Sequence, residues 1–156
     1  MSFIKFDEID LAILRELQGD GRMTNVELAQ RVGLTAPPCL RRVRSLEEAG
    51  AIDGYHAELN GSALGYGITV FAMVSLKTQA ESDLQAFEDY VGSLPQVREC
   101  YMLNGEIDFM LKIVARDLQT FQQFLTSQLT SAPNVASVKT SLTIRTSKDL
   151  PGFPID

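Results

Sequence analysis

The sequence predicts an α+β fold with a helical N-terminal domain and a ferredoxin-like C-terminal domain of β-α-β-β-α-β order. Two observations carry this prediction. Apolar residues recur at helical spacing through the first fifty residues, and from Ala51 onward apolar and polar residues alternate in segments separated by two further helical stretches. Strand, helix, strand, strand, helix, strand is the split β-α-β arrangement, in which both helices cover one face of a single sheet.

Length and composition are those of a globular protein. The chain has 156 residues, 45% of them apolar and 22% charged, so we expect one ordinary domain or two small ones and exclude a disordered or fibrous chain. No apolar run approaches the roughly 18 residues that span a bilayer, and the first residues do not form a secretory signal, so we expect a cytoplasmic protein. Cys39 and Cys100 are far apart and His56 is the single histidine, so no metal or cofactor is expected.

The first two helices are marked by capping residues. Asp7 is a suitable N-cap for the first helix, and Gly19 ends it. The second helix begins at a capping box, Thr24-Asn-Val-Glu27, and ends at Gly33. Their buried faces are formed by apolar residues at helical spacing: Ile9, Ile13, Leu17, Leu28, Ala29 and Val32.

Thr35 caps a third helix, which we expect to end near Ala49. Pro37 and Pro38 fall in its first turn, where a missing N–H costs little. At about 100° per residue, Arg41, Arg44 and Ser45 point away from the apolar face, and Arg42 lies on its flank. Two short helices joined by Gly33-Leu34-Thr35 match a helix-turn-helix, whose second helix enters the major groove of DNA.

The charge distribution agrees with this interpretation. The whole chain carries a net charge of −6, which argues against non-specific binding to nucleic acid. Between residues 22 and 46, however, Glu27 is the single acid, and the local charge is +4 because this window contains five arginines: Arg22, Arg31, Arg41, Arg42 and Arg44. A basic island of this kind can hold a phosphate backbone locally.

From Ala51 the pattern is that of a sheet with two helices. Strands are expected over 52–60 as a connector and over 66–77, 97–103, 107–115 and 135–146, with helices over 81–94 and 117–130. The expected domains are therefore residues 1–52 and 65–156, with a linker strand over 53–64. The sheet face away from the helices would carry Phe71, Met73, Met102 and Met110, and a partly apolar open face indicates an oligomerisation surface.

Seven short runs also carry a family resemblance. In order they are Asp10-Leu-Ala-Ile-Leu14, Gly21-Arg-Met-Thr-Asn-Val-Glu-Leu-Ala29, Val32-Gly-Leu-Thr35, Cys39-Leu-Arg-Arg-Val43, Leu46-Glu-Glu-Ala-Gly50, Gly54-Tyr-His-Ala57 and Gly105-Glu-Ile-Asp-Phe-Met-Leu-Lys112. Together they resemble the Lrp/AsnC (leucine-responsive, feast/famine) transcriptional regulators, over nearly the whole chain. The resemblance implies a regulator of amino-acid-related genes that binds double-stranded DNA, forms homodimers and then tetramers or octamers, does not associate with membranes, and responds to an amino-acid effector.

The expected DNA-binding residues belong to the helix-turn-helix. They are Arg22, Thr35, Ala36, Pro37, Pro38, Arg41, Arg42, Arg44 and Ser45. Arg41 and Arg44 are expected to read bases or to bind phosphates, the alternative being a solvated charged helix face. Arg42 has two open interpretations, a phosphate contact or an ion pair with an acid such as Glu47.

The expected effector site is the hairpin between the second and third sheet strands. Its residues are Asn104, Gly105, Glu106 and Asp108, with Thr140 and Ser141 from the last strand. The family resemblance implies that the effector binds between dimers, near this hairpin. Asp108 could accept the ammonium of an amino acid, and turn N–H groups could hold its carboxylate. Alternatively, Asn104-Gly105 is an ordinary hairpin turn.

Two further functions remain open from the sequence. The first is a small ferredoxin-like dimeric enzyme with a helical appendage, but Glu106 and Asp108 have no nucleophile, metal set or phosphate loop beside them in sequence. We therefore expect a protein that is not an enzyme. The second is an effector sensor that does not bind DNA and acts through protein partners.

Overall fold

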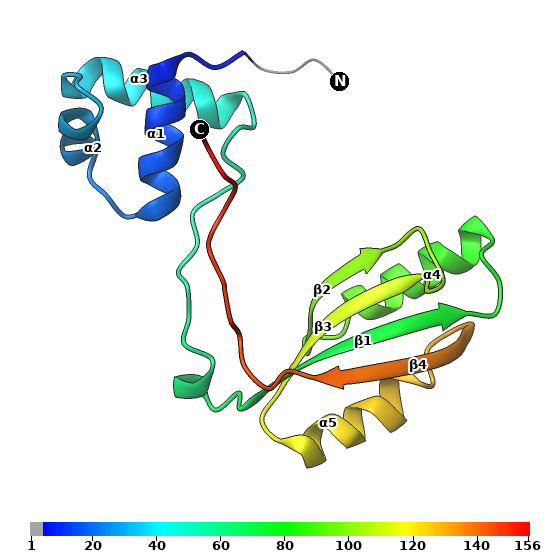
Figure 1. Cartoon of the computed structure of the whole chain (residues 1–156). Helices are drawn as coiled ribbons and strands as arrows, with labels where there is room; N and C mark the ends of the chain where they lie inside the picture. Colours follow the sequence, from blue (N-terminus) through cyan, green and yellow to red (C-terminus); the bar gives the residue numbers. More distant parts are fainter. Residues whose placement is uncertain (1–4) are drawn as a thin grey trace. The chain divides into compact units, whose positions relative to one another are not determined.

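The structure is a computed structural model that describes residues 5–156. The chain divides into two units, one made of residues 5–58 together with 148–156 and the other of residues 59–147 (Figure 1). The last nine residues were expected with the second domain but belong to the first unit, because they form hydrogen bonds with its first helix. Within the described residues, no helix is both long and apolar enough to cross a membrane.

The first unit holds three helices: α1 (Glu8–Gly19), α2 (Asn25–Arg31) and α3 (Ala36–Glu48). The two predicted N-caps of α1 and α2 are confirmed. Asp7 Oδ1 accepts a hydrogen bond from the backbone N–H of Asp10 at 2.8 Å, and Thr24 and Glu27 form a reciprocal capping box. The buried centre of the unit is apolar and consists of Ile13, Leu28, Ala29, Cys39 and Leu46.

Thr35 is the N-cap of α3, as predicted, but its side chain makes no capping hydrogen bond. An N-cap side chain normally accepts from the N–H of the second or third helical residue. In α3 these residues are Pro37 and Pro38, which have no N–H to donate. The prolines therefore set the start of the helix and leave the Thr35 hydroxyl available to other partners.

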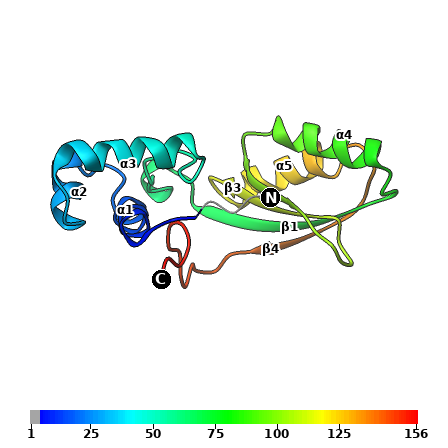
Figure 2. The same cartoon turned by 90° about the horizontal axis from the view of Figure 1, so that it is seen from above.

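The second unit is an antiparallel sheet of four strands with two helices on one face (Figure 2). The strand order is β2-β3-β1-β4, as expected for the ferredoxin-like arrangement. The elements are η1 (Ser62–Leu64), β1 (Ile68–Leu76), α4 (Glu81–Gly92), β2 (Val97–Met102), β3 (Phe109–Ala115), α5 (Leu118–Phe124), a π-helical turn (Leu125–Leu129) and β4 (Val135–Leu142).

The core of this unit lies between the sheet and its helices. Alternate residues of β1 and β3 are buried on that face, and Phe87 of α4 packs on Phe109 of β3 with ring centroids 4.7 Å apart. On the opposite face Phe71, Met73 and Met110 are half-buried in the single chain. Met102 was also expected on this face, but it pairs with the buried Phe109 and therefore lies on the face that the helices cover, where it is 60% exposed. The predicted partly apolar open face is therefore present.

Two expected strand segments differ from the structure. Residues 52–60 form no strand, and β4 ends at Leu142 instead of residue 146. A strand needs a neighbour with which to exchange backbone hydrogen bonds. Leu142 pairs with Val70 near the start of β1, so the residues that follow have almost no strand left to pair with. In the described part of the chain, no segment pairs with residues 52–60.

Substitutions at two leucines test the placement of this core. Leu111 is fully buried in β3, whereas Leu118 at the start of α5 is 54% exposed. We expect Leu111→Ala to lower the free energy of unfolding by about 2–5 kcal/mol and Leu118→Ala to change it by no more than about 0.5 kcal/mol. Denaturant unfolding followed by circular dichroism measures both. Equal effects of the two substitutions would contradict this arrangement of the sheet and helices.

Candidate DNA-binding and effector sites

The outward side of α3 carries the strongest candidate for DNA contact. Arg41, Arg44 and Ser45 are exposed, and within residues 5–156 no hydrogen bond or ion pair forms to the side chains of Arg41 and Arg44. Cys39 and Leu46 on the opposite side of the helix are buried in the core. The amphipathic pattern of α3 therefore holds the two guanidinium groups in solvent at a fixed spacing of three residues.

Arg42 has different contacts from Arg41 and Arg44. One of its guanidinium nitrogens lies 2.7 Å from Asp7 Oδ2 and 2.8 Å from Asp10 Oδ1. The N–H of Asp10 and the Arg42 guanidinium both stabilise the Asp7 carboxylate and hold its pKa below the usual value, and the two carboxylates raise the pKa of Arg42. Of the two interpretations left open by the sequence, the structure shows the ion pair. It joins α3 to the start of α1.

The acid suggested from the sequence for this pair, Glu47, has another partner. Its carboxylate accepts a hydrogen bond from the Tyr55 hydroxyl at 2.9 Å. Burial, and secondly this carboxylate, raise the pKa of Tyr55 to about 12. Tyr55 also packs against Gly21, where an added Cβ would lie 3.2 Å from the ring. The start of the linker is thus fixed on the helical unit.

Ion pairs reduce the positive charge that is free to act in the basic window of residues 22–46. Arg31 lies 3.0 Å from Glu16 of α1, and Arg42 is held by Asp7 and Asp10. Two of the five arginines are therefore neutralised by acids that precede the window in sequence. Within the described residues, the three whose guanidinium groups form no ion pair are Arg22, Arg41 and Arg44.

The turn between α2 and α3 is held by a residue that the sequence analysis missed. Asn25, the first residue of α2, donates from Nδ2 to the carbonyl oxygen of Ala36 at 2.8 Å. This bond places the first turn of α3, which contains the expected DNA-binding residues Ala36, Pro37 and Pro38. A polar residue directly after the Thr24 cap was the only signal in the sequence.

The predicted effector hairpin is exposed at its tip, and its aspartate is anchored. Asn104, Gly105 and Glu106 are exposed. Asp108 Oδ2 accepts hydrogen bonds from the N–H of Leu76 at 2.6 Å and from the Gln79 amide at 3.4 Å. Asp108 therefore fastens the hairpin to the end of β1, and its Oδ1 has no hydrogen bond from the described residues.

The two hydroxyl residues of β4 lie apart from this hairpin within one chain. Thr140 pairs with Ala72 and Ser141 with Phe71, whereas Asp108 meets β1 at Leu76. Four residues along a strand correspond to about 13 Å, and adjacent strand residues point to opposite faces. A single subunit therefore does not bring all six predicted effector residues into one pocket.

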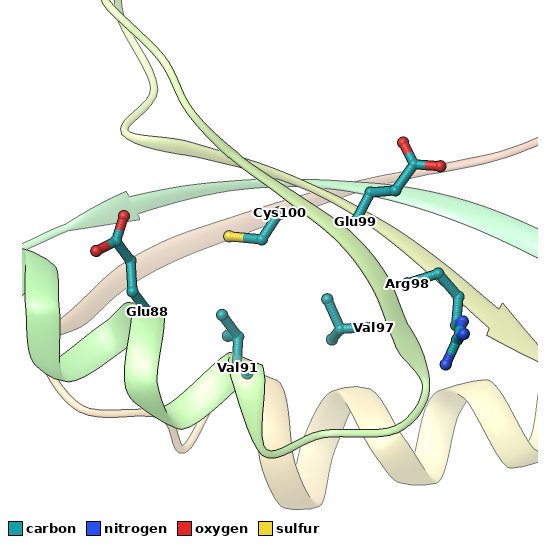
Figure 3. A pocket seen from close by; sticks show the side chains of 7 residues that line it. Glu88, Val91, Val97, Arg98, Glu99 and Cys100 are labelled. Carbon is teal, nitrogen blue, oxygen red and sulfur yellow. The ribbon is translucent and has the colours of Figure 1, made fainter. Parts of the chain in front are cut away.

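A separate hollow of about 310 Å³ lies between α4 and the edge strand β2 (Figure 3). Val91 and Val97 line its centre, the Cys100 sulfur faces the same space as Glu88, and Glu99 points away. Burial, and secondly the Glu88 charge, raise the pKa of Cys100 to about 11, so the thiol stays protonated at neutral pH. None of the predicted effector residues lines this hollow. Among the described residues, no group of three His, Cys, Asp or Glu side chains could hold a metal ion.

Comparison with known proteins agrees with both halves of the structure. Residues 6–53 match the model of a winged helix-turn-helix DNA-binding domain, and residues 69–153 match that of the Lrp/AsnC ligand binding domain. The chain is 58% identical over 146 residues to the leucine-responsive regulatory protein of Rhizobium meliloti (strain 1021), covering 94% of each chain. It is 44% identical to the Bkd operon transcriptional regulator of Pseudomonas aeruginosa, covering 90% of this chain and 92% of the relative.

Solved structures show the same fold over nearly the full length. A transcriptional regulator from Neisseria meningitidis, solved in complex with L-Met, superimposes with a TM-score of 0.93 at 34% identity, covering 97% of this chain and 98% of the other. AsnC of E. coli superimposes with a TM-score of 0.85 at 25% identity, covering 94% and 97%. The chain is thus a two-domain transcriptional regulator, with a DNA-binding helix-turn-helix and a ligand-binding domain. It belongs to the Lrp/AsnC family, as the sequence motifs had indicated.

The separate roles of Arg41 and Arg42 can be tested by unfolding. We expect Arg42→Ala to lower the melting temperature of the helical unit and Arg41→Ala to leave it unchanged. The pKa of Asp7 is lowered in the folded state, so its charge stabilises the fold above its usual pKa, and this contribution is lost as the pH falls through the lowered value. The difference between parent and Arg42→Ala should therefore shrink below about pH 4. A difference independent of pH would contradict the ion pair as its origin.

Proposed function

We propose that the chain binds its DNA sites through the exposed side of α3, with Arg41 and Arg44 as the principal contacts. The observation that carries this proposal is the contrast with Arg42. The charge of Arg42 is balanced by Asp7 and Asp10, whereas Arg41 and Arg44 extend into solvent. Arg22 would add a phosphate contact beside the recognition helix. In a dimer, two such helices would meet half-sites about one helical turn apart, or a multiple of it.

The first turn of α3 would approach the phosphate backbone. The Thr35 hydroxyl is not used for capping, so it can donate to a phosphate oxygen. The small side chains of Ala36, Pro37 and Pro38 would let the backbone of the DNA come close. Ser45 lies about one turn beyond Arg41 and directly follows Arg44. Arg42 acts in this scheme as a positioning residue, because it holds α3 on α1.

We propose that a second copy of the chain covers the open sheet face. Phe71, Met73 and Met110 lie on this face with Tyr101, which pairs with Met110, and burying such a patch between copies removes apolar surface from water. Dimers formed in this way would assemble further into tetramers or octamers. The unpaired segment over residues 52–60 is available for strand pairing in that assembly. A regulator of this kind would act on DNA in the cytoplasm.

An amino acid is the effector that the hairpin suits best. Asp108 Oδ1 can accept from an ammonium group, and the N–H groups around Asn104, Gly105 and Glu106 can hold a carboxylate. Thr140 and Ser141 would be supplied by another subunit, since one chain does not bring them to this hairpin. The relative from Neisseria meningitidis, solved with L-Met, supports this class of ligand. Genes of amino-acid metabolism are the corresponding targets.

Removal of both exposed guanidinium groups should abolish specific binding. For duplexes selected by the parent protein, we expect Arg41→Ala with Arg44→Ala to weaken binding at least about ten-fold. The salt dependence should also become less steep, because fewer phosphate counterions are released. Arg31→Ala, which removes an arginine already paired with Glu16, is the matched control and should change little. Fluorescence anisotropy at several salt concentrations measures both quantities. Unchanged binding by the double variant would exclude α3 as the recognition helix.

Loss of one charge should remove the effector response. Asp108→Asn keeps an oxygen that accepts from the Leu76 N–H, so we expect the fold and basal DNA binding to persist. We expect the shift in DNA affinity caused by a mixture of the common amino acids to be lost. Asp89→Asn, at an exposed position of α4, is the control and should retain it. A full response in Asp108→Asn would remove this residue from the effector site.

A further inference from the structure

The last residues of the chain lie along α1 and are held by its side chains. Gln18 Nε2 donates to the carbonyl oxygen of Phe153 at 2.9 Å, and the N–H of Phe153 donates to Gln18 Oε1 at 2.7 Å. Arg15 Nε donates to the carbonyl oxygen of Ile155 at 3.3 Å. The Gln18 amide thus pairs with both backbone groups of one residue, as a neighbouring strand would.

The sequence of the segment suits this binding mode. Gly152 has φ of +69°, which favours glycine, and a Cβ at this position would collide with the Gln18 side chain. Pro151 and Pro154 flank the Gly-Phe pair and restrict the unbound conformations of the segment. The Phe153 side chain is 81% exposed, so α1 recognises the backbone of this residue and not its ring.

The same helix also holds the recognition helix. Asp10 and the Asp7 cap contact Arg42 of α3, while Arg15 and Gln18, three residues apart on α1, contact the C-terminal segment. The segment continues from β4, the last strand of the second unit, so two stretches of chain connect the units: one at residues 58–59 and one at residues 147–148. The chain enters the helical unit at residue 148, and its docking on α1 at Phe153 fixes it there a few residues later. The second connection between the units is therefore short.

We propose that the Arg15–Gln18 face of α1 is a binding site for the chain's own C-terminal segment, residues 151–156, and that docking of this segment preorganises the DNA-binding unit. This inference rests on the proposed function of α3. Three exposed hydrogen bonds give weak association between separate molecules, but a covalent tether supplies an effective concentration on the order of millimolar. A unit held by two connections loses less orientational freedom when it binds a duplex than one held by a single linker.

The docking itself can be measured without DNA. We expect the Phe153 amide of the full-length protein to exchange slowly with solvent deuterium, and to exchange at least about ten-fold faster in Gln18→Ala and in Gly152→Ala. Gly152→Ala changes only the segment and leaves α1 intact, so faster exchange in this variant cannot result from a less stable helix. Gln30→Ala, at an exposed glutamine of α2, and Gly19→Ala, where an added Cβ meets nothing within 4 Å, are the controls. Fast exchange of this amide in the parent would overturn the proposal.

The consequence for DNA can then be separated from the role of the arginines. Undocking removes no phosphate contact, so Gln18→Ala and Gly152→Ala should weaken binding to a selected duplex about five-fold or more while the dependence of log Kd on log salt keeps its slope. Faster exchange with unchanged affinity would overturn the preorganising role. Failure of the parent protein to bind any duplex would instead contradict the proposed function of α3, and the exchange experiment would still decide whether the segment docks.

Discussion

The ion pair of Arg42 with Asp7 and Asp10 is the contact on which the geometry of the helical unit depends. Asp7 and Asp10 also form the reciprocal cap of α1, so one pair of carboxylates starts the first helix and holds the third. The apolar centre around Ile13 and Cys39 packs α1 against α3, and the amphipathic pattern of α3 turns Arg41 and Arg44 to solvent. The charged contact then fastens the flank of α3 to the start of α1.

Charge is distributed so that an acidic protein can still approach a polyanion. The chain carries a net charge of −6, and two arginines near the recognition helix are neutralised by the acids of α1. The other three arginines of residues 22–46, Arg22, Arg41 and Arg44, extend into solvent. They concentrate positive charge on the side of the helical unit that carries α3, while the net negative charge of the chain opposes contact with DNA elsewhere. Such an arrangement favours site-specific over non-specific binding.

Most of the fold could be predicted because its signals are local. The caps at Asp7 and Thr24, the amphipathic face of α3 and the alternation in β1 each depend on residues close in sequence. Contacts across long separations could not be predicted: the partner of Arg42 lies 35 residues away, and Gln18 meets Phe153 across 135 residues. The strand expected over 52–60 failed because a strand depends on a neighbour that one chain does not supply. The predicted effector residues were recognisable by type, but their separation in the sheet was not.

In the proposed function, exposed arginines on α3 give this family member sequence-specific binding to DNA, and an amino acid modulates that binding. The most direct test is selection of bound fragments from a random duplex-DNA pool by the purified full-length protein, at two salt concentrations and with or without the common amino acids. We expect enrichment of a roughly palindromic site, retention that falls steeply with salt, and a change in retention when amino acids are added. No enrichment under any of these conditions would exclude α3 as a sequence-specific DNA-binding helix.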